Sequence, residues 1–196
     1  NYGDIHGSLR LKNAICGMFK NQKPQNITIT HGTIGANQLV MLSLVEPNNK
    51  VVSIIPTYQQ HYSIPKSFGG KVHTLFLKEE NNWLPDLEEL EKIVSNDTKI
   101  ICMNNPNNPT GAVIPDEMLE KIVQIAKKSG AYILCDEVYR GLNHSGNPFS
   151  ISIADIYEKG ISTGSTSKVF SLAGLRLGWI VANENIIKEI NHQREY

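Results

Sequence analysis

One lysine stands among small hydroxyl residues in the stretch STGSTSK, residues 162–168, and Arg176 follows it in an apolar, glycine-rich run. A lysine amine is a nucleophile toward carbonyl carbons when its surroundings disfavour the ammonium form. An unpaired guanidinium is costly in apolar surroundings, so Arg176 is expected to meet an anion. For the same reason Lys168 is not expected to be a solvated surface lysine. The question is which chemistry requires a lysine, several hydroxyls and an arginine so close together.

Two known motifs overlap with this stretch. Gly164-Ser-Thr-Ser-Lys168 lacks the glycine that a nucleotide phosphate loop requires directly before its lysine. Ser165-Thr-Ser-Lys168 does fit the S-x-x-K pattern of penicillin-binding proteins and related lactamases, but the companion S-D-N and K-T-G elements are absent from the sequence. A serine acyl-enzyme therefore remains only a distant alternative.

A carboxylate and a phenol follow the apolar run AYILC, in the segment Asp136-Glu-Val-Tyr139. Burying a carboxylate costs free energy unless a cation or hydrogen-bond donors meet it. Asp136 is therefore either part of a site or a structural residue that caps a helix or pairs with Arg140. The sequence supports these two interpretations about equally.

Other segments that follow apolar runs have structural interpretations beside functional ones. Gly32-Thr33-Ile34-Gly35 leads into a predicted helix, where free backbone N–H groups bind anions, but a tight strand-to-helix turn explains it equally well. Tyr58 alone is better explained as a half-buried core aromatic. Asn108, which precedes Pro109-Thr-Gly, could simply be a turn residue. Each signal is weak alone, so its meaning depends on which residues the fold brings together.

The elements that must position these residues alternate between apolar runs and amphipathic stretches. Apolar runs predict strands at 26–30, 51–55, 71–77, 99–103, 131–135, 160–164 and 176–181. Helices are predicted at 8–20, 34–46, 86–94, 115–130 and 184–192, and the signals at Pro115 and Gly130 make the fourth of these the clearest. Alternating strands and helices predict a three-layer α/β/α domain with a mainly parallel sheet. Ligands of such sheets bind at the carboxyl ends of the strands.

Length and composition restrict the class of protein further. The 196 residues fit one domain, and 19 basic against 19 acidic residues leave no net charge and no basic stripe for a nucleic acid. The three cysteines lack metal-ligand spacing, which predicts no metal site and fits a reducing compartment. Neither a signal peptide nor a membrane-spanning run is visible, so we expect a cytoplasmic protein without a membrane partner.

Pyridoxal 5′-phosphate is a ligand that would use all of these groups. Its aldehyde requires an amine, its phosphate requires donors and positive charge, and its ring requires a stacking partner. Its pyridine nitrogen requires an anion to stay protonated. An ion pair at about 4 Å, with an effective dielectric near 20, is worth roughly 4 kcal/mol, which is enough to keep that nitrogen protonated at neutral pH.

The candidate motifs also occur in the order found in the class I/II aminotransferases, which are fold type I pyridoxal-phosphate enzymes, and the resemblance covers nearly the whole chain. Residues 104–111, NNPNNPTG, resemble the family's N-P-x-N-P-T-G turn, and residues 136–139, DEVY, resemble its D-E-x-Y element. Residues 165–178 resemble its lysine signature, S-x-S-K followed by G-x-R-x-G. The resemblance implies the fold of the family's cofactor-binding large domain.

The resemblance implies a role for each candidate residue. Lys168 would form the Schiff base, Asp136 would hold the pyridine nitrogen, and these two with Tyr139 are the candidate catalytic residues. Tyr139 and Asn108 would hydrogen-bond the cofactor's phenolic oxygen, while Tyr58 would stack on its ring. The phosphate would be held by Gly32, Thr33, Ile34, Ser165, Ser167, Arg176 and, from the neighbouring subunit, Tyr2.

The implied activity is the transfer of an amino group between an amino acid and a 2-oxo acid by a homodimer with a shared active site. β-Elimination of a sulfur amino acid, or other carbanion chemistry on the same cofactor, stays open, and a non-catalytic truncated domain is a more distant alternative. Ile34 departs from the family pattern, which often has Ser or Thr there. The resemblance ends near the last helix of the large domain, so residues 1–196 are expected to be that domain, without the small carboxy-terminal domain and the amino-terminal arm.

Overall fold

A seven-stranded sheet forms the centre of the computed structural model, which describes residues 3–142 and 149–194. The strands are β1 (Ile27–His31), β2 (Lys50–Ile55), β3 (Lys71–Phe76), β4 (Thr98–Asn104), β5 (Tyr132–Asp136), β6 (Gly160–Ser165) and β7 (Leu177–Val181). Their order across the sheet is β1-β7-β6-β5-β4-β2-β3. β7 is antiparallel to both its neighbours, and all other pairs are parallel, which confirms the predicted mainly parallel sheet.

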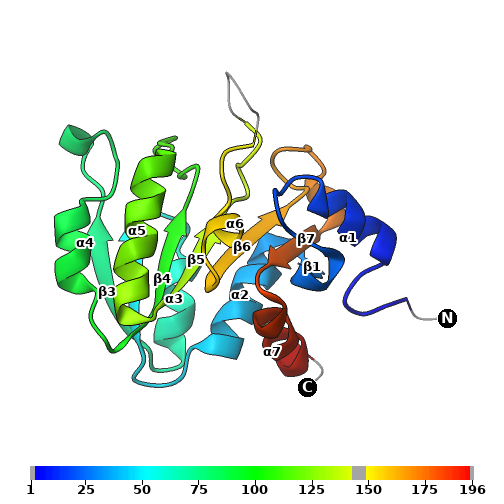
Figure 1. Ribbon diagram of the computed structural model, residues 1–196, viewed down its shortest axis with the longest axis horizontal. Helices are drawn as coiled ribbons and strands as arrows, with labels where there is room; N and C mark the ends of the chain where they lie inside the picture. Colours follow the sequence, from blue (N-terminus) through cyan, green and yellow to red (C-terminus); the bar gives the residue numbers. More distant parts are fainter. Residues whose placement is uncertain (1–2, 143–148, 195–196) are drawn as a thin grey trace.

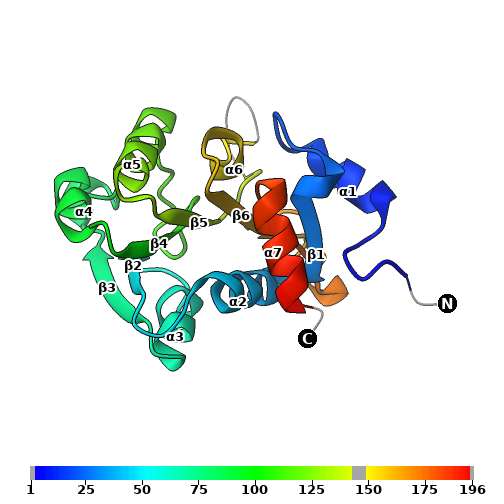
Figure 2. The ribbon, with the colours of Figure 1, turned by 60° about the horizontal axis from the view of Figure 1, so that its bottom comes forward.

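Helices cover both faces of this sheet (Figures 1 and 2). One face carries α1 (Leu9–Cys16), α4 (Leu87–Ile93), α5 (Asp116–Ser129) and α6 (Ile153–Ile156). The other face carries α2 (Gly32–Leu44), α3 (Gln60–Ser67) and α7 (Glu184–Arg194). The predicted three-layer α/β/α architecture is therefore confirmed. Across the described ranges, no helix has the length and apolarity needed to cross a membrane.

The sheet core explains why the strand segments are apolar on both sides. Ile101 of β4 and Ile133 of β5 belong to a buried cluster with α5, whereas Ile100 and Leu134 belong to a cluster with α2 and α7 on the opposite face. Successive strand residues point to opposite faces, and here helices cover both faces. Each fully buried side chain of this kind stabilises the fold by about 1.5–3 kcal/mol.

Helix α5 shows how local sequence signals set the ends of an element. Pro115 is the N-cap, and Asp116 and Glu117 lie in the first turn, where carboxylates favour the helix dipole. Gly130 ends the helix with a φ of 73°, and its N–H donates to the carbonyl of Ala126. A residue with a side chain is disfavoured at such a φ, so the glycine explains the stop.

The structure adds two helices that the sequence pattern did not predict, α3 and α6. α3 contains Pro65, which lacks an N–H and is usually read as a helix terminator. The helix nevertheless packs against α2 and β3, with Pro65 and His61 buried. Tertiary packing thus overrides a weak local preference. The helix α6 has only four residues, too few for a periodic signal.

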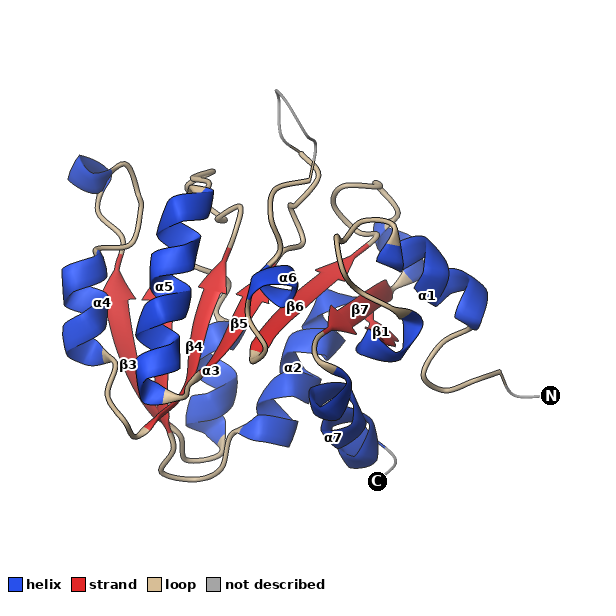
Figure 3. Ribbon diagram, in the orientation of Figure 1, coloured by secondary structure: helices blue, strands red, loops and turns tan. Residues whose placement is uncertain are grey.

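The strands other than β7 direct their carboxyl ends toward one edge, as the arrows of β3, β4 and β6 show in Figure 3. Gly178, at the start of β7, brings that strand close to the first residue of α2. A Cβ atom at position 178 would lie 2.3 Å from the carbonyl carbon of Gly32. No side chain fits between these two backbones, so the approach depends on Gly178.

Gly178→Ala is therefore expected to lower the free energy of unfolding by about 1–3 kcal/mol, because the methyl group overpacks against backbone that cannot yield. Gly174→Ala is the matched control, since a Cβ there would meet nothing within 4 Å. The control should change stability by no more than about 0.5 kcal/mol. Urea unfolding of both variants measures the difference, and equal losses would contradict the packing argument.

Candidate active site

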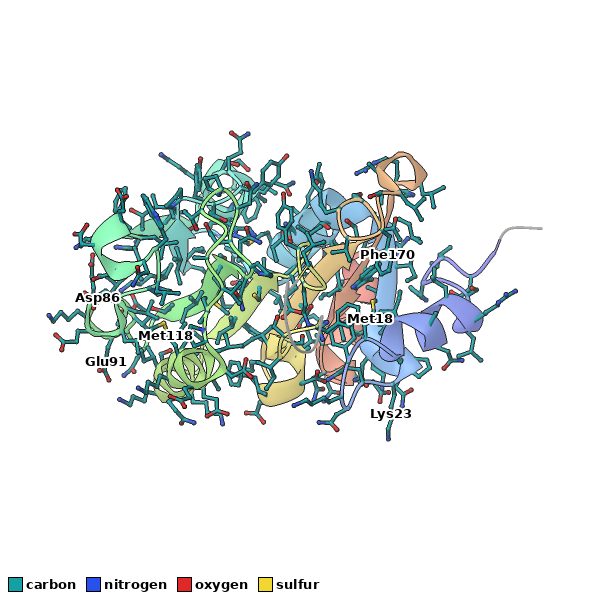
Figure 4. The ribbon with its side chains drawn as sticks, turned by 90° about the horizontal axis from the view of Figure 1, so that it is seen from above. Met18, Lys23, Asp86, Glu91, Met118 and Phe170 are labelled. Atoms are coloured by element: carbon teal, nitrogen blue, oxygen red, sulfur yellow. The ribbon has the colours of Figure 1, made fainter. Side chains whose placement is uncertain are left out.

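A cavity of about 270 Å³ lies at the carboxyl ends of the strands. Figure 4 looks down on this edge and labels Phe170, on the loop between β6 and β7. The residues predicted from the sequence that line the cavity are Thr33, Ile34, Tyr58, Asn108, Asp136, Tyr139, Ser165, Ser167, Lys168 and Arg176. Gly32 lies against Arg176, and Tyr2 lies outside the described residues. The fold thus gathers segments that are far apart in sequence.

Asp136, the last residue of β5, is buried with 5 % of its surface exposed. Its Oδ2 accepts a hydrogen bond of 3.0 Å from Asn37 Nδ2, and its Oδ1 accepts one of 3.1 Å from the backbone N–H of Val138. Burial raises the pKa of Asp136 to about 6, and these hydrogen bonds oppose the rise. Within the described ranges, no Lys, Arg or His nitrogen lies within 4 Å of the carboxylate. The carboxylate therefore faces the cavity without a cation.

Arg140 does not pair with Asp136, so one structural interpretation of this carboxylate is wrong. The Nε of Arg140 lies 3.7 Å from Glu137 Oε2 and donates a 2.7 Å hydrogen bond to the carbonyl of Ser150. Glu137 also accepts hydrogen bonds from the hydroxyls of Ser152 and Ser162. Residues 138–141 form a turn and not a helix, so Asp136 is not a helix cap either. The network around Glu137 instead fixes the turn that carries Tyr139.

The turn after β4 is tied to Asp136 through Asn104. Asn104 Nδ2 donates a 2.7 Å hydrogen bond to the Asp136 carbonyl, and Asn104 Oδ1 accepts a 2.6 Å hydrogen bond from the backbone N–H of Asn108. Asn107 Nδ2 donates a 3.1 Å bond to the carbonyl of Pro56, two residues before Tyr58. These side-chain amides position three loops relative to one another.

The opposite part of the cavity is suited to an anion. The Arg176 guanidinium donates to the Ala173 carbonyl at 2.9 Å and lies 3.5 Å from Ser167 Oγ. Gly32 has a φ of +69°, which strains any residue with a side chain, and a Cβ there would lie 2.4 Å from Arg176 Nη2 and displace the guanidinium. The hydroxyl of Thr33 is buried there without a hydrogen-bond partner among the described residues. Free N–H groups of a first helical turn, a hydroxyl and a guanidinium together favour a phosphate.

Lys168 and Arg176 are exposed in the chain, whereas the sequence predicted apolar surroundings for both. The reason is the loop that carries them: it projects beyond the end of β6 (Figure 1, orange), and residues 170–176 are all exposed. Its apolar residues Phe170, Leu172 and Leu175 are exposed as well. The run therefore does not bury the cations, and both face the cavity from its rim.

Sequence reasoning missed some residues that line the cavity, among them Asn37 and Asn104. Both are buried, with 1 % and 5 % of their surface exposed. Asn37 lies in α2 next to the fully buried Ala36 and three residues before the fully buried Val40. A polar residue on such an apolar helical face requires a partner. The sequence therefore indicates that Asn37 needs a hydrogen-bond partner, although it does not indicate that the partner is Asp136.

The arrangement fits a flat ligand with an anionic group, a carbon that reacts with an amine, and a cationic ring atom. The anion would lie at Arg176 and Thr33, the amine is that of Lys168, and the cationic atom would meet Asp136. Tyr58 lines the same cavity and offers an aromatic surface. An α/β sheet with a site of this kind at its strand ends is typical of enzymes that hold a phosphate-bearing cofactor.

Comparison with known proteins identifies the family. Residues 1–195 match the model of the family described as Aminotransferase class I and II, and the chain belongs to this family. Members of the family depend on pyridoxal 5′-phosphate, whose groups correspond to those that the cavity fits.

Curated relatives and solved structures share the sequence over most of its length. An aspartate aminotransferase of Pyrococcus horikoshii is 35 % identical over 172 residues, which cover 88 % of this chain and 44 % of the relative. The capreomycidine synthase of Streptomyces vinaceus is 28 % identical over 99 % of this chain and 50 % of its own length. A crystal structure of a PLP-dependent aminotransferase from Streptococcus suis is 47 % identical with a TM-score of 0.95, covering 100 % of this chain and 52 % of that one. The chain thus spans about half the length of the relatives it matches.

The raised pKa of Asp136 predicts a pH-dependent cost to stability. An unfolded aspartate titrates near 3.9, so the folded chain loses stability as the pH rises from about 4 through about 6, and the loss is then constant. Asp136→Asn removes that charge. Its free energy of unfolding should exceed that of the wild type by about 2–3 kcal/mol at pH 7 and match it near pH 4.

Urea unfolding of both proteins from pH 4 to 8 measures this difference. Burial lowers the pKa of His61 to about 4, which makes stability rise with pH over much of the same range. That effect is common to both proteins and cancels in the comparison. A difference that stayed constant with pH would show that Asp136 is not the group responsible.

Proposed function

We propose that the protein is a pyridoxal-phosphate-dependent aminotransferase that moves an amino group between an amino acid and a 2-oxo acid, and that residues 1–196 form its cofactor-binding large domain. The observation that carries the proposal is the buried Asp136 carboxylate, which faces the cavity of Lys168 and Arg176 without a cation of its own among the described residues. Family membership supports the same conclusion.

The phosphate of the cofactor is held at the start of α2. Arg176 supplies positive charge, and the hydroxyls of Ser165, Ser167 and Thr33 supply donors. The backbone N–H groups of Thr33 and Ile34 add the favourable end of the helix dipole. Ile34 offers no hydroxyl, so in this chain the side-chain donor from this segment is Thr33.

The ring of the cofactor is held at three places. Asp136 holds the pyridine nitrogen, because a buried carboxylate with a free side toward the cavity stabilises a proton there. Asn108 and Tyr139 lie on neighbouring loops that line the cavity and would hydrogen-bond the phenolic oxygen. Tyr58 stacks on the ring, which contributes about 1 kcal/mol beyond the area it buries.

Bound pyridoxal phosphate supplies an electron sink that stabilises negative charge at the α-carbon of an amino acid. Lys168 would hold the cofactor through its amine, and the same amine would move a proton between the substrate's α-carbon and the cofactor's aldehyde carbon. Asp136 keeps the electron sink effective by holding the ring nitrogen protonated. Ser165 and Arg176 keep the ring in place while the proton moves.

The proposed assembly is a cytoplasmic homodimer with a shared active site, in which Tyr2 reaches the phosphate bound by the neighbouring subunit. The exposed apolar side chains of Phe170, Leu172 and Leu175 support it, because they lie on the loop that carries Lys168 and Arg176 and a second copy would cover them. The proposed substrates are small molecules, an amino acid and a 2-oxo acid.

Lys168→Ala tests the proposal. The wild type mixed with pyridoxal phosphate should develop the visible absorption band of the protein-bound cofactor, and borohydride should fix the cofactor covalently on the peptide that contains residue 168. The variant should show neither effect, and its transamination rate should fall by at least about a thousandfold. Absorption spectra, peptide mass mapping and 2-oxo acid assays provide the three measurements.

Lys121→Ala is the matched control, because Lys121 is an exposed lysine of α5 that does not line the cavity. It should bind and react as the wild type does. A visible band that persisted in Lys168→Ala, with borohydride fixing the cofactor on another lysine, would overturn the assignment. Transamination leaves a 2-oxo acid and an aminated cofactor, whereas elimination releases pyruvate, ammonia and a thiol. The second set of products would overturn the proposed reaction but not the assignment of the site.

A further inference from the structure

Asn37 joins two buried groups that belong to different strands. Its Nδ2 donates a 3.0 Å hydrogen bond to Asp136 Oδ2, at the end of β5. Its Oδ1 accepts a 2.7 Å hydrogen bond from the hydroxyl of Thr163, on the neighbouring strand β6. Asn37 has 1 % of its surface exposed and Thr163 none, so water does not compete for either bond.

The direction of these bonds depends on the charge of Asp136. A side-chain amide can turn over and exchange its oxygen with its nitrogen. In the present orientation the N–H of Asn37 faces the carboxylate, which suits an ionised Asp136. In the reversed orientation the amide oxygen would face the carboxylate, and this is favourable only if Asp136 carries a proton. In the present orientation the hydroxyl of Thr163 donates to Asn37 Oδ1, which leaves the amide N–H of Asn37 for the carboxylate.

We propose that Asn37, oriented by Thr163, is a positioning residue that keeps the Asp136 carboxylate ionised and directed into the cavity. That this carboxylate then meets a protonated ring nitrogen rests on the proposed function. The remaining bond to the carboxylate, from the N–H of Val138, comes from the backbone and fixes Oδ1. With the two oxygens held from α2 and from the turn, the carboxylate cannot rotate away from the cavity.

The other groups near Asp136 do not substitute for Asn37. The titratable residues that line the same cavity are Lys168, Arg176, Tyr58 and Tyr139, and neither cation lies within 4 Å of the carboxylate in the described chain. Glu137 is directed to the opposite side, toward Ser152 and Ser162. Besides Asn37, α2 contributes only Thr33 and Ile34 to the lining, and neither titrates. The hydrogen bond from Asn37 is thus the side-chain interaction that favours the ionised form.

The experiment follows the carboxyl ¹³C signal of Asp136 between pH 4 and 9 in wild type, Asn37→Leu, Thr163→Val and Asn37→Asp. The titration midpoint should rise by about one pH unit in Asn37→Leu, because a hydrogen bond to the charged form is lost. Thr163→Val should give a smaller rise, since the amide loses only its orientation. Asn37→Asp keeps the shape but places a second carboxylate beside Asp136, so its midpoint should rise most.

The same proteins are titrated with pyridoxal phosphate at pH 5, below both midpoints. There a rise of one unit lowers the ionised fraction of Asp136 about tenfold, and the affinity of Asn37→Leu should fall by a similar factor. Tyr157→Phe is the matched control. It also loses a buried hydrogen bond, of 2.7 Å to the carbonyl of Ala131, but Tyr157 belongs to the core cluster on the α5 face and does not line the cavity. Its Asp136 midpoint and its affinity for the cofactor should equal those of the wild type.

An Asp136 midpoint that stays at the wild-type value in Asn37→Leu and in Asn37→Asp overturns the positioning role, whatever the cofactor does. Thr163→Val is included in case the Asn37 variants do not fold, because it replaces only a hydroxyl by a methyl group. An unchanged Asp136 midpoint in Thr163→Val overturns the role of Thr163. If the midpoints rise while the affinity for pyridoxal phosphate stays constant, Asn37 still sets the ionisation of Asp136, and the proposed contact of Asp136 with the cofactor is refuted.

Discussion

The structure depends on one costly arrangement, a carboxylate buried at the end of an apolar strand without a cation beside it in the described chain. Burial alone would neutralise Asp136, and it does raise the pKa to about 6. Two hydrogen bonds, from Asn37 and Val138, offset part of this cost. What remains is an anion directed at a cavity, and its most favourable partner is a cation supplied by a ligand. The uncompensated carboxylate therefore lowers the stability of the folded chain, and a cationic ligand that binds beside it restores that stability.

The three-layer fold makes this arrangement possible. Helices on both faces exclude water from the strands, so Asp136 lies in a medium of low dielectric constant although it is at a strand end. The parallel strands β4, β5 and β6 finish side by side, which places the Asn104 turn, Asp136 and the hydroxyl-rich loop around a single cavity. The close approach of Gly178 to Gly32 completes the cavity, because it brings the start of α2 next to the Arg176 guanidinium.

The sequence was sufficient to predict the layers and the strands, since periodic apolar runs are local properties. Its motifs and their resemblance to a known family predicted most of the residues around the cavity, but not Asn37 or Asn104. It predicted neither α3, which forms despite Pro65 because of packing against α2, nor the exposure of Lys168. It left the partner of Asp136 open between Arg140 and a ligand. Only the fold decides this, because Arg140 turns to Glu137 on the other side of the strand. The pairing of Asn37 with Asp136 spans 99 positions and has no signature in a single sequence.

The most direct test of the account is the protonation state of the cofactor's ring nitrogen, read from the ¹⁵N chemical shift of labelled pyridoxal phosphate bound at pH 8. A protonated nitrogen is expected in the wild type, at a pH where the free pyridine would be largely neutral. An unprotonated nitrogen is expected in Asp136→Asn, which has the same shape and no charge. An identical ¹⁵N shift in both proteins would contradict the claim that this buried carboxylate exists to hold a cation.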